Sequence, residues 1–343
     1  TPHAAWNNLY GFLGIFLLTI LFFCGCMPSK RKDRRLETYQ FGVYFVLYAV
    51  ILLFGLIFSY HFGLSIRFFL FHMTCLLTVL LMISSIRSTA QLKLLIGIIL
   101  VSVTICSLYG CFQGVVGVEI SAAQVDYSLE LNAGVPGRIY SFFDNPNNFA
   151  EILVTLMPFY WAFLLMVKGW QKKLIVFIAM IPSIVAILMT YSRSGWIGLA
   201  LAVIIFFAFQ NWRLIPICII VGIAAIPLLP QGIVNRILTI GNTQDSSTMY
   251  RFQIYDTIWP MFKDHWATGV GLGSDTVKEV IMTYPTKLSN QAYPIHSHNT
   301  YLQLWLECGI FGLFAFLGGT LFQFKEGIRK IFHPNCSTTL KYI

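Results

Sequence analysis

Two histidines stand directly before an apolar run, in the segment His296-Ser297-His298-Asn299. The following run, 300–322, is close to the ~20 residues that cross a bilayer, which places the imidazoles near the membrane surface. A neutral imidazole with a pKa near 6.5 can take a proton from a hydroxyl group, so His298 is a candidate general base with His296 and Asn299 as support. A purely structural histidine and a metal ligand remain alternatives, although no third ligand stands at a recognised zinc spacing.

Three arginines are candidates for binding an anion. Arg193 lies in YSRSGW, a short hinge between two apolar runs, close to the open amides of the next helix. Arg251 begins a predicted helix, and Arg138 precedes a polar segment before another run. Several guanidinium groups would suit a diphosphate, whose charge exceeds what one arginine can match. The alternative for each is a guanidinium in solvent or among lipid headgroups.

Glu307 lies inside the last apolar run, where a carboxylate is costly unless it is paired or hydrated. It could orient a partner in the site, or it could satisfy backbone amides where Gly309 and Gly312 let another helix approach. The sequence contains no phosphate-binding glycine loop, nucleophile elbow or DxD-like acidic pair, which argues against an ATP-driven machine or a nucleotide-sugar enzyme.

The elements that must position these residues are membrane helices. Of the 343 residues, 57% are hydrophobic and only 11% are charged, against about 25% charged in ordinary domains, which excludes most soluble classes. We expect an all-α, polytopic membrane bundle forming one domain over 1–343, with a first span that is retained rather than cleaved as a signal peptide. About nine spans are predicted, at 8–27, 40–60, 68–86, 94–116, 149–167, 174–191, 195–210, 214–230 and 300–322.

The distribution of basic residues predicts the orientation of these spans. Fifteen lysines and arginines fall in alternate intervals that include the run KRKDRR. The other intervals hold eight, five of them in the long interval 232–299, where the positive-inside rule has little weight. The N-terminus should therefore lie outside and the C-terminus in the cytoplasm. The net charge of +9 is then mostly an orientation signal, and no nucleic acid partner is expected.

Two external segments, 117–148 and 232–299, are too long to be simple turns, and function should be sought there. In the second, aromatic and aliphatic residues recur near helical spacing from Tyr250 to Phe262. This pattern predicts an amphipathic helix within a large external loop between the last two spans. Such a helix could contact substrate or only pack on the bundle.

Four blocks of the sequence resemble the O-antigen ligase family. The most specific is His298-Asn299, nine residues, then Gly309-Ile310-Phe311-Gly312, within HNTYLQLWLECGIFGLFAFL. The others are SRSGW, RFQIYDTIWPMFKDHWATGVGLGSD and FFDNPNNFAEIL, and together the resemblance covers roughly residues 100 to 320. Trp266 stands where the family often has proline, and the chain ends sooner after the last span than relatives usually do.

The resemblance implies a glycosyltransferase in the bacterial inner membrane that moves a glycan from an undecaprenyl-diphosphate carrier to an acceptor hydroxyl on the external face. Arg193 and Arg251 match the family's two functional arginines and would bind the diphosphate, with Arg138 as a further candidate, and His298 would be the base. Because a diphosphate is a good leaving group, no metal or other cofactor is strictly required. A lipid A core acceptor would make the protein a ligase, and a carrier-linked chain would make it a polymerase.

Three alternative functions remain open. A protein hydroxyl as acceptor would make the chain a protein glycosyltransferase. A transporter or lipid flippase could line its path with the same arginines and histidines, although such proteins place charges near the membrane midplane. The chain could also be a non-catalytic remnant of the family.

Overall fold

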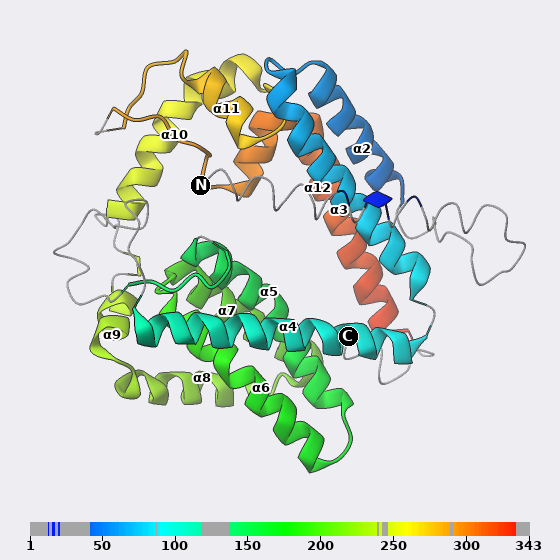
Figure 1. The fold of residues 1–343 in the computed structure, drawn as a ribbon, viewed down its shortest axis with the longest axis vertical. Helices are drawn as coiled ribbons and strands as arrows, with labels where there is room; N and C mark the ends of the chain where they lie inside the picture. The colour runs from blue at the N-terminus through cyan, green and yellow to red at the C-terminus, as the bar shows by residue number, and fades with distance from the viewer. Residues whose placement is uncertain are drawn as a thin grey trace, which may run out of the picture. The chain divides into compact units, whose positions relative to one another are not determined.

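The computed structural model describes residues 13, 16–17, 20, 42–86, 88–117, 137–143, 145–238, 240–241, 246–288 and 291–333. Within these ranges every regular element is a helix, which confirms the predicted all-α class (Figure 1). Most of the predicted span 8–27, the KRKDRR run, and residues 118–136 and 334–343 lie outside the described ranges.

The described helices follow the apolar runs closely. Their bounds are α2 Gly42–Ile57, α3 Phe62–Ser85, α4 Thr89–Val116, α5 Pro146–Met166, α6 Trp170–Met189, α7 Arg193–Asn211, α8 Leu214–Ala225, α9 Gln231–Leu238, α10 Ser246–His265, α11 Ser274–Ile281 and α12 Thr300–Ile331. Of these described helices, six are long and apolar enough to cross a membrane, namely α3 to α7 and α12. Two shorter apolar helices, α2 and α8, fall in predicted spans, so the polytopic membrane fold is confirmed while the number nine stays a prediction.

The chain divides into two compact units. Unit 1 comprises residues up to Ser88 together with Met249–His333, and therefore contains α2, α3, α11, α12 and most of α10. Unit 2 comprises Thr89–Thr248 and contains α4 to α9. The single membrane domain expected from the sequence stays a prediction, and the two units are described separately.

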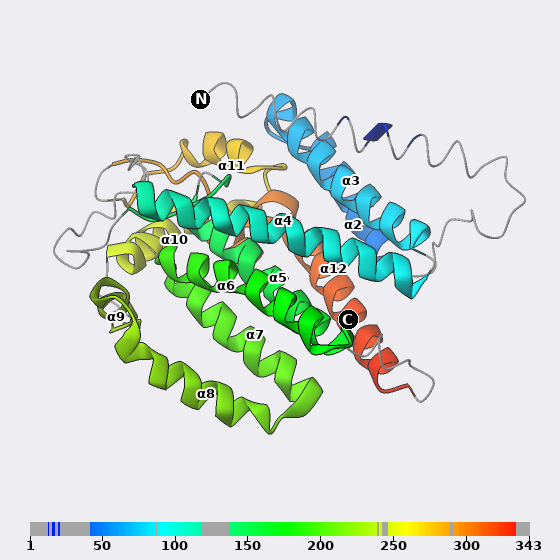
Figure 2. The ribbon, with the colours of Figure 1, turned by 60° about the horizontal axis from the view of Figure 1, so that its bottom comes forward.

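Unit 2 is built on α5, which packs against α4, α6 and α7 (Figures 1 and 2). Its inner stripe, Phe149, Leu153, Met157 and Tyr160, has the spacing of one helical face and is almost fully buried. The Tyr160 hydroxyl lies 2.7 Å from the Thr104 hydroxyl on α4, so the polar end of the ring is satisfied inside the bundle.

Small residues let the helices of unit 2 approach closely. A Cβ at Gly195 on α7 would lie 2.8 Å from the Cβ of Ala150 on α5. A Cβ at Gly110 on α4 would lie 2.8 Å from the Phe149 ring. Both positions therefore exclude a side chain, which is the pattern expected where membrane helices are held by packing rather than by the hydrophobic effect.

In unit 1, α12 packs against α2, and α2 against α3 (Figure 1). A second cluster joins α10 and α11 to α12 through Ile254, Ile258, Val277, Ile281 and Leu306. The predicted helix of the external loop is present as α10, but its aromatic residues divide between two faces. Phe262 is buried, whereas Phe252 and Trp259 are about half exposed, so the inner face is mainly aliphatic.

The helix α12 is interrupted at Gly309, whose φ of 69° and ψ of −178° are not helical. The carbonyls of Leu306 and Glu307 at this break accept hydrogen bonds from the amides of Val270 (2.8 Å) and Gly271 (3.2 Å). The Ile310 amide donates to the carbonyl of Trp266 (3.0 Å). The loop before α11 therefore supplies the partners that the broken helix would otherwise lack in a membrane.

Candidate functional site

The histidine segment forms a tight turn at the start of α12. Asn299 caps the helix, because its Oδ1 accepts from the amides of Tyr301 (3.1 Å) and Leu302 (3.2 Å). The hydroxyl of the buried Ser297 donates to the carbonyl of Asn299 (2.9 Å). Between them, His298 has a φ of 53°, a left-handed conformation that is uncommon outside glycine.

The turn places its two imidazoles beside α10. The ring centroids of His296 and His298 are 4.0 Å apart, and the Tyr250 ring meets His298 edge-on at 6.3 Å. Both imidazoles keep an exposed side, but the protein atoms around them lower their pKa values. For His298 this partial burial, together with the charges of His296 and Arg251, brings the pKa to about 4. His298 is therefore neutral near pH 7 and able to accept a proton.

Glu307 reaches this turn through a residue that sequence reasoning missed. Its Oε1 accepts a hydrogen bond from the Gln303 side-chain amide (2.8 Å), whose Oε1 accepts from the backbone amide of Ser297 (2.8 Å). Glu307 itself is buried in α12. The spacing of Gln303, four residues before Glu307 and four after the cap Asn299, was the available signal, because such residues share one helix face.

In unit 2, Arg138 joins three segments at one end of the helices. Its Nε donates to the carbonyl of Thr190 at the end of α6 (2.7 Å), and its Nη2 donates to Oδ1 of Asn147 in the first turn of α5 (2.7 Å). The guanidinium thus satisfies a carbonyl at the C-terminus of α6, where a positive charge is favourable. Two of its N–H donors are engaged in hydrogen bonds within unit 2.

Arg193 is the first residue of α7, separated from α6 by a short hinge. The preceding Ser192 caps α7, its hydroxyl oxygen accepting from the Gly195 amide (3.3 Å), and Tyr191 takes a left-handed φ of 51°. Because the helix begins at Arg193, the guanidinium and the positive end of the helix dipole are adjacent. Arg138 contacts the same hinge through Thr190.

The predicted site residues therefore fall into two groups. Unit 1 holds Arg251, the two histidines and Asn299 together, with Glu307 connected through Gln303. Unit 2 holds Arg138 and the hinge that carries Arg193. Across the part of the chain that the structure describes, no group of three or more His, Cys, Asp or Glu side chains is placed to hold a metal ion.

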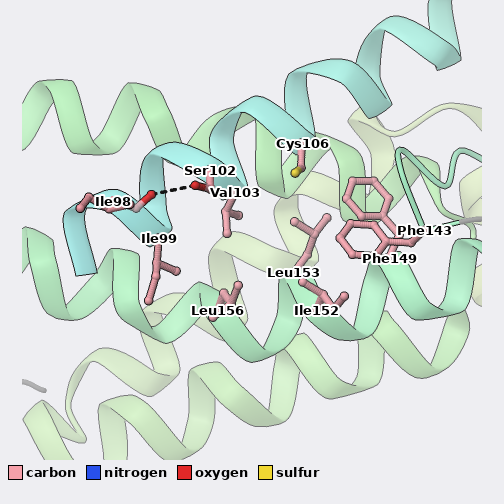
Figure 3. A pocket seen from close by; sticks show the side chains of 10 residues that line it. All are labelled: Ile98, Ile99, Ser102, Val103, Cys106, Phe143, Phe149, Ile152, Leu153 and Leu156. Atoms are coloured by element: carbon pink, nitrogen blue, oxygen red, sulfur yellow. Dashed lines mark hydrogen bonds between the residues drawn. The ribbon is translucent and has the colours of Figure 1, made fainter. Parts of the chain in front are cut away.

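Unit 2 also contains an apolar pocket between α4 and α5, with a volume of about 240 Å³ (Figure 3). The single hydroxyl in its lining, that of Ser102, donates to the carbonyl of Ile98 on its own helix (3.0 Å). The lining is therefore suited to hydrocarbon rather than to a polar ligand. It consists of Ile98, Ile99, Ser102, Val103, Cys106, Phe143, Phe149, Ile152, Leu153 and Leu156.

A family model described as O-antigen ligase matches residues 152–317. This range begins in α5 and ends in α12, so it contains the Arg193 hinge, α10 and the histidine turn. The comparisons with curated proteins and with solved structures gave no match. The matched range and the membrane helices agree with the sequence motifs, and residues 152–317 of the chain are similar to the O-antigen ligase family.

Proposed function

We propose that the protein transfers a glycan from an undecaprenyl-diphosphate carrier to an acceptor hydroxyl on the external face of the bacterial inner membrane. The observation that carries this proposal is the histidine turn, where a neutral, partly exposed His298 stands at the beginning of a membrane helix beside Arg251. A base and a cation close enough to influence each other electrostatically suit a reaction that deprotonates a hydroxyl and releases an anion.

In the proposed reaction, the acceptor hydroxyl loses its proton to His298 while its oxygen bonds to the anomeric carbon. The bond from that carbon to the diphosphate oxygen breaks, and the electron pair leaves with undecaprenyl diphosphate. Direct displacement inverts the anomeric centre. The bound diphosphate also places negative charge near the imidazole, which raises the pKa of His298 and makes it a stronger base during transfer.

Arg193 and Arg251 bind the diphosphate in this proposal and stabilise the charge that develops as it departs. Arg138 has the secondary part of holding the Arg193 hinge, since its guanidinium already donates to Thr190 and Asn147. The proposed topology has the histidine turn outside and the C-terminus in the cytoplasm, as the basic residues indicate.

We propose ligase activity, with lipid A core as the acceptor. A carrier-linked chain as acceptor would instead make the protein a polymerase of the same family. The two are separated by offering each acceptor to the purified protein in liposomes containing the carrier-linked glycan. Extension of lipid A core supports the ligase, and growth of the carrier-linked chain supports the polymerase.

The general-base role is tested by measuring release of undecaprenyl diphosphate from the same liposomes. His298→Ala is expected to reduce kcat by about 10²–10⁴-fold, the usual contribution of a general base. His61→Ala is the matched control, because His61 is an exposed histidine of unit 1 that precedes α3. Wild-type release by His298→Ala would refute the assignment.

The diphosphate contacts are tested separately through the donor. Arg193→Ala and Arg251→Ala are each expected to raise the donor KM, with Arg213→Ala, an exposed arginine between α7 and α8, as control. An unchanged donor KM in both variants would exclude the proposal that Arg193 and Arg251 bind the diphosphate. Movement of the carrier-linked glycan across the membrane without cleavage would favour a transporter.

A further inference from the structure

The Gln303 side chain, in the first turns of α12, accepts one hydrogen bond and donates another. Its Oε1 accepts from the Ser297 amide, and its Nε2 donates to the Glu307 carboxylate, both at 2.8 Å. A carboxamide group has a carbonyl oxygen that accepts and an NH₂ group that donates, so it can bridge a backbone N–H and a carboxylate. The Gln303 side chain is half-buried, which strengthens both bonds.

The Glu307 end of this link is fixed by the surrounding structure. Glu307 is 7% exposed, lies two residues before the Gly309 break, and its own carbonyl accepts from the Gly271 amide (3.2 Å). The backbone of Gly273 is a further hydrogen-bond partner of its carboxylate. Glu307 is therefore held by the same loop that closes the break in the helix.

The other end of the link is the turn that carries His298. A left-handed φ of 53° is unfavourable for histidine and persists only where neighbouring contacts enforce it. On one side the cap Asn299 supplies those contacts. On the other side the contact is the bond from the buried Ser297 to Gln303.

We propose that Gln303 is a positioning residue for the reaction. Its hydrogen bonds connect the immobile Glu307 side chain to the Ser297 amide, and this connection holds the His298 imidazole where it accepts the proton. This inference rests on the proposed general-base role of His298. Gln303 itself contacts neither of the reacting groups in this scheme. Its removal should therefore lower kcat and leave the donor KM unchanged.

Gln303→Glu tests the link with almost no change in side-chain size. The new carboxylate can still accept from Ser297, but it replaces a donor to Glu307 by a second negative oxygen, and like charges at this distance repel. The displaced turn is expected to lower kcat about tenfold or more, since small misplacements of catalytic groups have large effects. The donor KM should stay within about twofold of wild type by the same reasoning.

The exchange Gln303→Glu/Glu307→Gln tests the direction of the bonds. In this double variant the carboxylate at position 303 accepts both from Ser297 and from the new amide at position 307, so the chain of contacts is restored. We expect kcat to recover to within about threefold of wild type, a non-additive rescue. Gln323→Glu, an exposed position on the same helix, is the matched control.

Each outcome has a defined meaning. Wild-type kcat in Gln303→Glu, or a loss that the exchange does not rescue, overturns the positioning role. If the charged variant unfolds, Gln303→Met removes both bonds without a charge, and wild-type kcat in that variant overturns it equally. His298→Ala is measured alongside: if it keeps full activity, the general-base proposal has failed, whatever the Gln303 variants do.

Discussion

The α-carbon of Gly309 faces the backbone carbonyl of Ala267 so closely that a methyl group at position 309 would collide with it. The same glycine has a φ of 69°, which other L-residues rarely adopt. Contact and conformation therefore both require glycine at the point where α12 is interrupted.

We predict that Gly309→Ala strongly destabilises unit 1, because the loop at Ala267 must move and the new residue is strained. The loss should exceed about 3 kcal/mol, the size of effects that combine strain and overpacking. Thermal unfolding in detergent measures it. Gly327→Ala, a helical glycine of α12 with no neighbour within 4 Å, should be neutral or slightly stabilising; equal melting temperatures for the two variants would contradict the prediction.

Arg138 should not tolerate replacement by lysine. Lysine keeps the charge but cannot hold the fork that reaches Thr190 and Asn147 at once. We expect Arg138→Lys to lower the unfolding free energy by about 2 kcal/mol, a typical value for charge-assisted hydrogen bonds. Arg213→Lys at an exposed position is the control in the same thermal assay. A melting temperature equal to that of the control would show that these bonds contribute little.

The acid limb of the pH–rate profile should report the lowered pKa of His298. In the free enzyme the imidazole stays neutral until the pH falls to about 4, so kcat/KM should remain flat between pH 6.5 and 5. Below that pKa the imidazolium cannot accept a proton and the rate falls. Since the charge of Arg251 helps to lower this pKa, Arg251→Gln should move the limb to higher pH. A wild-type limb near 6.5 would contradict the environment described for His298.

Asn299 offers a variant that keeps the cap but changes the charge beside the base. Aspartate caps a helix as well as asparagine does, so Asn299→Asp should fold normally. Its carboxylate next to His298 should raise the pKa of the imidazole and shift the acid limb upward. Asn299→Ala should instead cost about 1 kcal/mol of stability through loss of the cap. Identical pH profiles for the aspartate variant and wild type would count against this interpretation.

The apolar runs predicted the helices well because membrane helices are specified by length and hydropathy. The predicted run 300–322 begins at the same residue as α12, but the helix continues to Ile331. The prediction ended early because the last turns of the helix are polar and carry no hydropathy signal. The run 68–86 missed the first six residues of α3 (62–67), which starts at Phe62. The short helices α9 and α11 were not predicted, because eight residues offer little periodicity.

The sequence indicated candidate residues for the site but not their contacts. His298 and Asn299 were proposed because their types are unusual beside a span, and the capping role of Asn299 was not predicted. Gln303 was missed because a lone glutamine in a helix has no distinctive chemistry until its partners, Ser297 and Glu307, are known. The carbonyl of Trp266 accepts from the Trp305 indole (2.6 Å) and from the Ile310 amide (3.0 Å), contacts that the sequence did not indicate.

The break in α12 has a consequence for the order in which the chain is made. The carbonyls of Leu306 and Glu307 lie at the break and would each cost several kcal/mol in lipid without a donor. Their donors, the amides of Val270 and Gly271, each lie 36 residues earlier in the sequence (306 − 270 and 307 − 271). During N-to-C synthesis the complementary loop is therefore already complete when the broken helix emerges, and α12 never has to enter the bilayer before its partners exist.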